Sequence, residues 1–347
     1  MKTPAARGPV SSALVDLLEN QNSAAEPALA ASLHDLADAG IRDTEDILHD
    51  EDLQAAVFTA YELRYSGLDG LADDWEWHPD VLALCATIEL AFERALRDRV
   101  PMPALPAPGV DSVAAALFEM AAADTGPSVS RFLAKKATDE QAHEFLIQQS
   151  VYKLKEADPH SWAIPRLRGR AKAALVEIQA DEYGDGRLDR MHSELFAQTM
   201  REVGLDDTVG YYVDAVPAIT LATSNMMTMF GTHRRLRGAI AGHLAAFEIT
   251  SSLPNRQYGN GFRRLGYDFQ VTHYFDEHVE ADAVHEQIAA RDLAGALTVD
   301  EPDLLEDVMF GASACLYVDG LAGTALLAAW TAGESSLRVA EPVSPRA

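Results

Sequence analysis

The chain has 347 residues, 48% of them hydrophobic, which is enough for a large core in one or two domains. The 54 acidic residues outnumber the 28 lysines and arginines and give a net charge of -26, so we expect neither nucleic acid nor an anionic membrane among its partners. Two cysteines, no apolar signal segment and no run of 18 apolar residues favour a cytoplasmic protein without a disulfide framework.

Helical periodicity runs through almost the whole chain, and no segment shows the sustained alternation of a β-strand. The fold class is therefore all-α. Four prolines within residues 100–109 predict a linker between an N-terminal helical extension (1–99) and a main domain (110–335), which a flexible tail (336–347) follows. Helices are predicted over 27–39, 51–66, 79–99, 111–124, 138–158, 167–203, 217–231, 234–250, 268–291 and 303–331.

The most informative motif is His278-Val-Glu-Ala-Asp282-Ala-Val-His285, within the predicted helix 268–291. The two histidines and the aspartate lie at i, i+4 and i+7, so their side chains fall within about 60° of one another on one helix face. This spacing is typical of a metal-binding face. One face supplies at most three ligands, so a catalytic metal needs partners from elsewhere in the chain.

A second set of candidate ligands lies in the predicted helix 167–203. Glu182, Asp189 and His192 fall at i, i+7 and i+10 and share a face if the helix is continuous. However, two glycines interrupt the segment and together cost about 2 kcal/mol relative to alanine in a helix. They mark either a kink or an ordinary helix boundary, and a boundary would remove the common face.

Both candidate faces contain a carboxylate-x-x-His pair, an arrangement that di-iron carboxylate proteins use on inward-facing helices. Four of the eleven histidines have an acidic residue three positions earlier, where chance predicts about two from the acidic content of the chain. The pairs alone are therefore weak evidence. A third candidate ligand on each face strengthens this evidence: His278 accompanies the pair that ends at His285, and Glu182 accompanies the pair that ends at His192. Imidazole and carboxylate ligands without thiolate suit iron or manganese, and such a charged set disfavours haem.

Three segments together resemble the haem-oxygenase-like di-iron oxidases and oxygenases, also called iron-containing redox enzymes. They are Lys155-Glu-Ala-Asp-Pro-His-Ser-Trp-Ala-Ile-Pro-Arg166, Glu182-Tyr-Gly with His192, and the motif that ends at His285. The resemblance covers roughly residues 110–331. It implies a haem-oxygenase-like helical bundle with an N-terminal helical extension, and a homodimer.

The resemblance also implies a ligand set for two Fe(II) ions per chain, with O₂ as co-substrate and an external reductant as electron donor. Some amine-oxidising members have a further carboxylate seven residues after the second-helix glutamate. Here that position holds an aspartate, which is one methylene shorter. The implied ligands are Glu156, Glu182, His192, His278, Asp282 and His285, with Asp189 as the further carboxylate.

Simpler interpretations of individual residues stay open at this point. Glu156 has the sequence context of a surface carboxylate before Asp158-Pro159, and Glu177 is close enough in helical phase to His192 to compete with Glu182. His160 follows the proline, so a structural or hydrogen-bonding role is favoured for it.

The resemblance implies an enzyme that uses O₂ to oxidise a small molecule. We expect N-oxygenation of an amino acid or related amine in secondary metabolism, on the argument that Asp189 adds a carboxylate to the cluster. Oxidative desaturation or C–C cleavage of an amino or fatty acid is the alternative, because the other six ligands fit both reactions. A metal-binding protein without turnover is a further alternative, since a fold does not by itself imply function.

Overall fold

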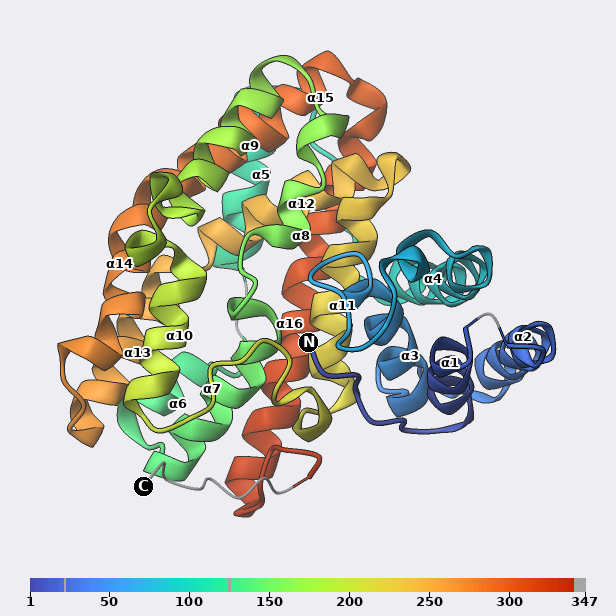
Figure 1. The fold of residues 1–347 in the computed structure, drawn as a ribbon. Helices are drawn as coiled ribbons and strands as arrows, with labels where there is room; N and C mark the ends of the chain where they lie inside the picture. The colour runs from blue at the N-terminus through green and yellow to red at the C-terminus, as the bar shows by residue number, and fades with distance from the viewer. Residues whose placement is uncertain (22, 124–125, 340–347) are drawn as a thin grey trace.

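The computed structural model describes residues 1–21, 23–123 and 126–339, with the backbone but not the side chains of 280–283. Within these ranges the chain is helical and has no strand, which confirms the all-α prediction (Figure 1). The α-helices are α1 (Pro9–Glu19), α2 (Glu26–Asp43), α3 (Glu51–Glu62), α4 (Pro79–Arg99), α5 (Val110–Ala122), α6 (Val129–Lys135), α7 (Asp139–Lys153), α8 (Asp158–Ser161), α9 (Gly169–Glu182), α10 (His192–Glu202), α11 (Ala218–Thr232), α12 (Arg237–Ile249), α13 (Ser252–Leu265), α14 (Phe269–Gln287), α15 (Ala296–Asp300) and α16 (Leu305–Ala332).

Local sequence signals explain where several of these helices begin. Thr138 and Gln141 form a reciprocal capping box at the start of α7, and the Asp50 carboxylate accepts hydrogen bonds from two backbone N–H groups at the start of α3. Pro79 occupies the first turn of α4, where its missing N–H costs nothing.

The structure differs from the predicted elements in two ways. The predicted helix 167–203 is divided into α9 and α10, because the chain turns at residues 183–191. Helices α1, α6 and α13 and the short helices α8 and α15 were not predicted. The sequence of α13 is polar and contains two glycines, but one of them, Gly261, packs against the backbone of Leu133 in α6, so close helix packing stabilises a segment of low helix propensity.

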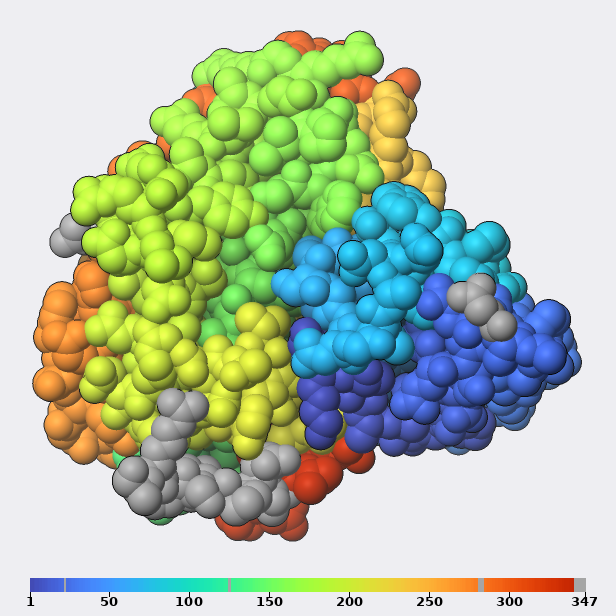
Figure 2. All heavy atoms as spheres, in the orientation of Figure 1, coloured from blue at the N-terminus to red at the C-terminus, as the bar shows by residue number. Residues whose placement is uncertain are grey.

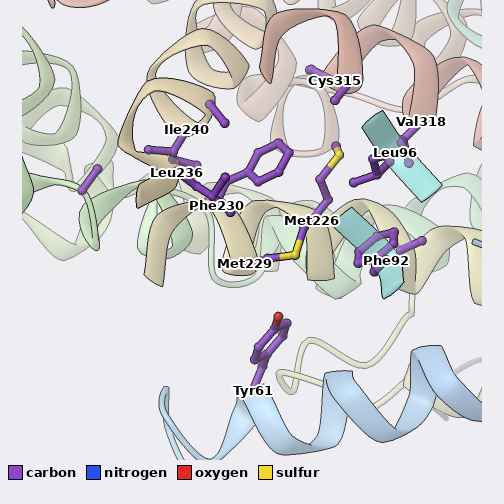
Figure 3. Packing of buried hydrophobic residues seen from close by; sticks show 14 of the residues in the cluster. Tyr61, Phe92, Leu96, Met226, Met229, Phe230, Leu236, Ile240, Cys315 and Val318 are labelled. Carbon is purple, nitrogen blue, oxygen red and sulfur yellow. The ribbon is translucent and has the colours of Figure 1, made fainter. Parts of the chain in front are cut away.

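The centre of the core is formed by α11, α12 and α16. Phe230 of α11, Ile240 of α12 and Cys315 of α16 are at most 1% exposed and lie close together in Figure 3. Helices α12 and α16 cross closely because glycines stand at the contact: Gly242 packs against the backbone of Val308, and Gly311 packs against the backbone of α12.

The close crossing predicts a large effect of a single methyl group. Gly242→Ala should destabilise the protein by about 1–3 kcal/mol, because the added Cβ overlaps the Val308 carbonyl and the helices must move apart. Urea unfolding measures this change. Gly320→Ala is the matched control on α16, since its Cβ would meet nothing within 4 Å. That variant should be neutral or slightly stabilising, and equal losses in both variants would contradict the packing argument.

Segment Pro302–Ala332, which includes α16, is long and apolar enough to cross a membrane by length and composition alone. In the structure the first half of α16 is buried: Val308, Phe310 and Val318 are at most 1% exposed, and the helix packs against α12 and α11. Its place in the protein core therefore explains the apolar composition of this first half, while 33% of the apolar window as a whole is buried.

The N-terminal helices α1–α4 lie at one side of the molecule, in blue to cyan in Figures 1 and 2. Their buried side chains join those of α11, α12 and α16 in one continuous apolar cluster. Polar contacts reinforce this packing: the Asn225 side chain of α11 donates to the backbone and side-chain oxygens of Gln54 in α3, and Lys155 forms a buried ion pair with Glu62.

Candidate metal centre

Buried acidic and histidine side chains from five parts of the chain meet between α9, α10, α12 and α14. Their candidate ligand atoms fall into two groups, and within each group all of these atoms lie within 4.8 Å of one another. Glu182 belongs to both groups. The first contains Glu156, Glu182, His192 and His278, and the second contains Glu182, Glu248 and His285.

A turn, and not a continuous helix face, brings Glu182 and His192 together. Glu182 is the last residue of α9 and His192 the first of α10, and His192 Nδ1 lies 3.0 Å from Glu182 Oε2. The turn depends on Gly184, which has φ +61°, because a side chain there would meet the backbone of Arg190 and Met191. Glu182 and His192 therefore do not share one helix face as predicted. A turn of nine residues brings their side chains together instead.

Helix α14 places His278 and His285 in the cluster, as their i, i+7 spacing predicted. His278 Nδ1 donates to the Tyr274 carbonyl oxygen at 2.8 Å, and His278 Nε2 lies 3.6 Å from Glu156 Oε1. His285 Nε2 lies 2.9 Å from a carboxylate oxygen of Asp181, and its Nδ1 lies 3.6 Å from Glu248 Oε2. Each ring therefore has one nitrogen on an orienting partner and the other toward the cluster, as metal-binding histidines do. The side chain of Asp282, predicted as the third ligand of this face, lies outside the described residues.

Glu156 follows α7 in a tight turn and is 4% exposed, so it is not the surface carboxylate that its sequence context allowed. The next residue, Ala157, has φ 78°, an unusual backbone conformation for alanine that directs Glu156 inward. Lys153 forms an ion pair with Glu156 Oε1, and the Tyr274 hydroxyl donates to Oε2 at 2.8 Å.

Glu248 was missed by the sequence analysis. It lies near the end of α12, is 3% exposed, and has Oε2 3.6 Å from His285 Nδ1. The available signal was its position after Ala245-Ala-Phe in an otherwise apolar helix, because an isolated carboxylate in such a helix is costly to bury without a partner. Its helix carries no second candidate ligand at helical spacing, so no pattern was visible.

The structure does not bring Asp189 into the cluster. Its side chain is 76% exposed in the turn between α9 and α10, with the nearest charged partner, Arg187, at 3.6 Å. Glu177 is exposed on α9, which leaves Glu182 as the α9 carboxylate in the cluster. His160 is buried against His243, with 3.2 Å between their ring nitrogens, and burial lowers the pKa of His160 to about 4.

The electrostatics of the cluster fit a cation. Burial alone would raise the pKa of Glu182, but the adjacent His192 holds that pKa below its usual value. Burial would lower the pKa of His285, yet hydrogen bonding and charge from Glu248 and Asp181 outweigh it and raise the pKa to about 10. A protonated imidazole therefore supplies positive charge between carboxylates. Three buried carboxylates with three imidazoles suit divalent iron or manganese, and Glu182 can be shared between two ions.

The comparison with known proteins agrees with this site. A family model described as iron-containing redox enzyme matches residues 143–320, more than half of the chain. The chain belongs to the iron-containing redox enzyme family. This confirms the resemblance and shows that the protein is an oxidoreductase. The matched region contains every residue of the two ligand groups.

One curated relative of this iron-containing redox enzyme is the nitrosourea synthase of Streptomyces achromogenes subsp. streptozoticus. The two are 28% identical over 233 residues, which cover 65% of this chain and 49% of the relative. The chain thus matches about half the length of that protein.

A cavity of about 410 Å³ lies beside the candidate metal centre of this iron-containing redox enzyme. Tyr152 and Phe247 line both the cavity and a small void next to Glu156, Glu182 and Glu248. Lys153 and Tyr274, which hold Glu156, also line the cavity. A small molecule in this cavity would therefore be separated from the candidate ligands by one layer of side chains.

Proposed function

We propose that the protein is a non-haem di-iron oxygenase that uses O₂ and an external reductant to oxidise the nitrogen of an amino acid or related amine. The observation that carries the proposal is the pair of buried ligand groups that share Glu182 beside a cavity of substrate size. Two Fe(II) ions would occupy the two groups. The first would take Glu156, His192 and His278, the second would take Glu248 and His285, and Glu182 would serve both.

The surrounding residues have defined tasks in this proposal. When bound, iron supplies the electron transfer and Lewis acidity that O₂ activation requires. Lys153 and the Tyr274 hydroxyl fix the two oxygens of Glu156, and Asp181 orients His285. Tyr152, Phe247 and Ser251 border both the cavity and the small void at the cluster, and they would position a molecule beside the reacting centre.

The choice of a nitrogen substrate is supported by the similarity to a nitrosourea synthase, whose name denotes a product with an oxidised nitrogen. The earlier argument through Asp189 loses its support, because this side chain is exposed and outside the cluster. Glu248 instead supplies an additional buried carboxylate. The proposal therefore stands on the cluster, the cavity and the similarity.

The direct test combines the anaerobically Fe(II)-loaded protein with a reductant, O₂ and a panel of amino acids and amines. Mass spectrometry should detect hydroxylamine, nitroso or nitro products, with the added oxygen derived from ¹⁸O₂. An alkene, an aldehyde or a shortened chain without nitrogen oxidation would instead identify desaturation or C–C cleavage. Fe(II) binding without O₂ consumption for any substrate would contradict an oxygenase.

The placement of Asp189 gives a separate prediction. Asp189→Ala should keep its iron content and its rate within about twofold of the wild type, since surface substitutions away from special features have effects within about 0.5 kcal/mol. Iron analysis and product formation measure both quantities. A large loss of iron would show that the turn 183–191 rearranges when metal binds and brings Asp189 inward.

A further inference from the structure

Asp319 is an unusual residue at its position in the fold. It lies in the middle of α16, between Leu316-Tyr-Val and Gly320-Leu-Ala, and lines the cavity beside the metal centre. Solvent reaches the side chain through this cavity. The neighbouring cavity walls are apolar or aromatic and include Leu326, Tyr258 and Phe275. The side chain of Asp319 is solvent-exposed, so a molecule that enters the cavity can reach its carboxylate.

The protein itself supplies little compensation. Among the residues that the structure describes, Asp319 forms no ion pair, and its hydrogen-bond contact is the weak donor Cys315 Sγ at 3.8 Å. Burial raises the pKa of Asp319 to about 6, although the positive charge of Lys153 acts in the opposite direction. Lys153 is itself engaged by Glu156. Asp319 is thus a carboxylate that faces a cavity without a dedicated cationic partner.

The rest of the cavity suits an organic cation. Tyr258, Phe247 and Tyr274 contribute aromatic rings, which attract ammonium and guanidinium groups. Polar groups lie along α7, α11 and α13, among them Gln148, Thr223 and Asn255. The cavity therefore combines a carboxylate, aromatic faces and neutral polar groups. Its lining also includes two cationic side chains, Arg131 and Lys153, and Lys153 is paired with Glu156.

We propose that Asp319 binds a positively charged nitrogen group of the substrate, an alkylammonium or a guanidinium, by a charge-assisted hydrogen bond. This inference rests on the proposed function and names its substrate class. A nitrogen held by Asp319 stays protonated and has no lone pair for oxidation. The nitrogen that is oxidised is therefore a second one, and the substrates are small molecules with two nitrogen groups, such as basic amino acids and diamines.

Calorimetry on the full chain, loaded anaerobically with Fe(II), tests the proposal without turnover. L-Arginine, L-lysine and putrescine are the cationic probes. L-Citrulline and norleucine are the counterparts of the first two, because they keep the α-ammonium and carboxylate groups but have uncharged side chains. The wild type should bind arginine about tenfold or more tightly than citrulline, and lysine similarly more tightly than norleucine. This comparison needs no variant and so does not depend on the folding of one.

Asp319→Asn should remove that preference and weaken the tightest cation by about tenfold or more, with little effect on the neutral probes. Its melting temperature should stay close to that of the wild type, because Asp319 is exposed and makes no ion pair among the described residues. Glu306→Gln, an exposed acid on the same helix, is the matched control and should change nothing. Failure of all cationic probes to bind, or equal cation binding by Asp319→Asn, would overturn the proposal.

The outcomes separate this inference from the proposed function. Cation binding through Asp319 without any nitrogen oxidation would contradict the proposed function and support the binding site. Oxidation of an amine that has only one nitrogen, with no loss in Asp319→Asn, would support the function and overturn the binding site.

Discussion

Replacing Glu182 by alanine is expected to remove nearly all bound iron, whereas replacing Glu248 should remove about half. Glu182 is the residue common to both ligand groups, so its loss weakens both ions, while Glu248 belongs to the second group alone. His192→Ala changes the first group and should keep only the ion of the second group. Glu248→Ala should give the opposite result and keep only the ion of the first group. Iron analysis after anaerobic loading and desalting measures these contents, with two irons per chain expected for the wild type.

The control for this series is Glu177→Ala, which removes an exposed carboxylate from the same helix as Glu182. Its iron content should equal that of the wild type. If Glu248→Ala lost as much iron as Glu182→Ala, the two ligand groups would not act as two separable sites. Full retention of iron in Glu182→Ala would refute the assignment of the centre.

Fe(II) should raise the thermal stability of the protein strongly. The centre joins α9, α10, α12, α14 and the turn after α7, so a bound ion stabilises the folded chain and not the unfolded one. Free metal at a thousand times its dissociation constant contributes about 4 kcal/mol. For a domain of this size we expect a rise in melting temperature of about 5–15 °C.

Anaerobic calorimetry or fluorescence melting with Fe(II) measures this shift, and Mg²⁺, which prefers oxygen ligands, is the control ion. The Glu182→Ala variant should show little stabilisation by Fe(II). The effect should diminish as the pH falls, because the imidazoles and carboxylates must lose protons to bind metal. An unchanged melting temperature in the wild type would argue against a site assembled from several helices.

The sequence pattern agrees with the structure for the two candidate ligands of one helix whose side chains are described. His278 and His285 follow helical spacing within α14, and the structure places both in the cluster. Helical spacing was less reliable for Glu182 and His192. The predicted helix ends at Glu182, and a turn that depends on Gly184 brings the two side chains together. The residues were assigned by family resemblance, while the physical reason for their proximity became visible only in the structure.

Contacts between distant segments could not be predicted in the same way. Glu248 joins the cluster because α12 packs against α14. The sequence of either helix alone does not indicate which helix it packs against. The cavity has the same origin, since its walls come from α6, α7, α10, α11, α12, α13, α14 and α16. The all-α class, in contrast, followed from periodicity, because each helix displays its own buried face.

The central claim is that two iron ions lie on either side of Glu182 in the helical core. The most direct measurement is a crystal structure of the anaerobically Fe(II)-loaded protein with anomalous diffraction recorded at the iron absorption edge. The account predicts two anomalous peaks, one among Glu156, Glu182, His192 and His278 and the other among Glu182, Glu248 and His285. A single peak, or peaks away from these side chains, would contradict it.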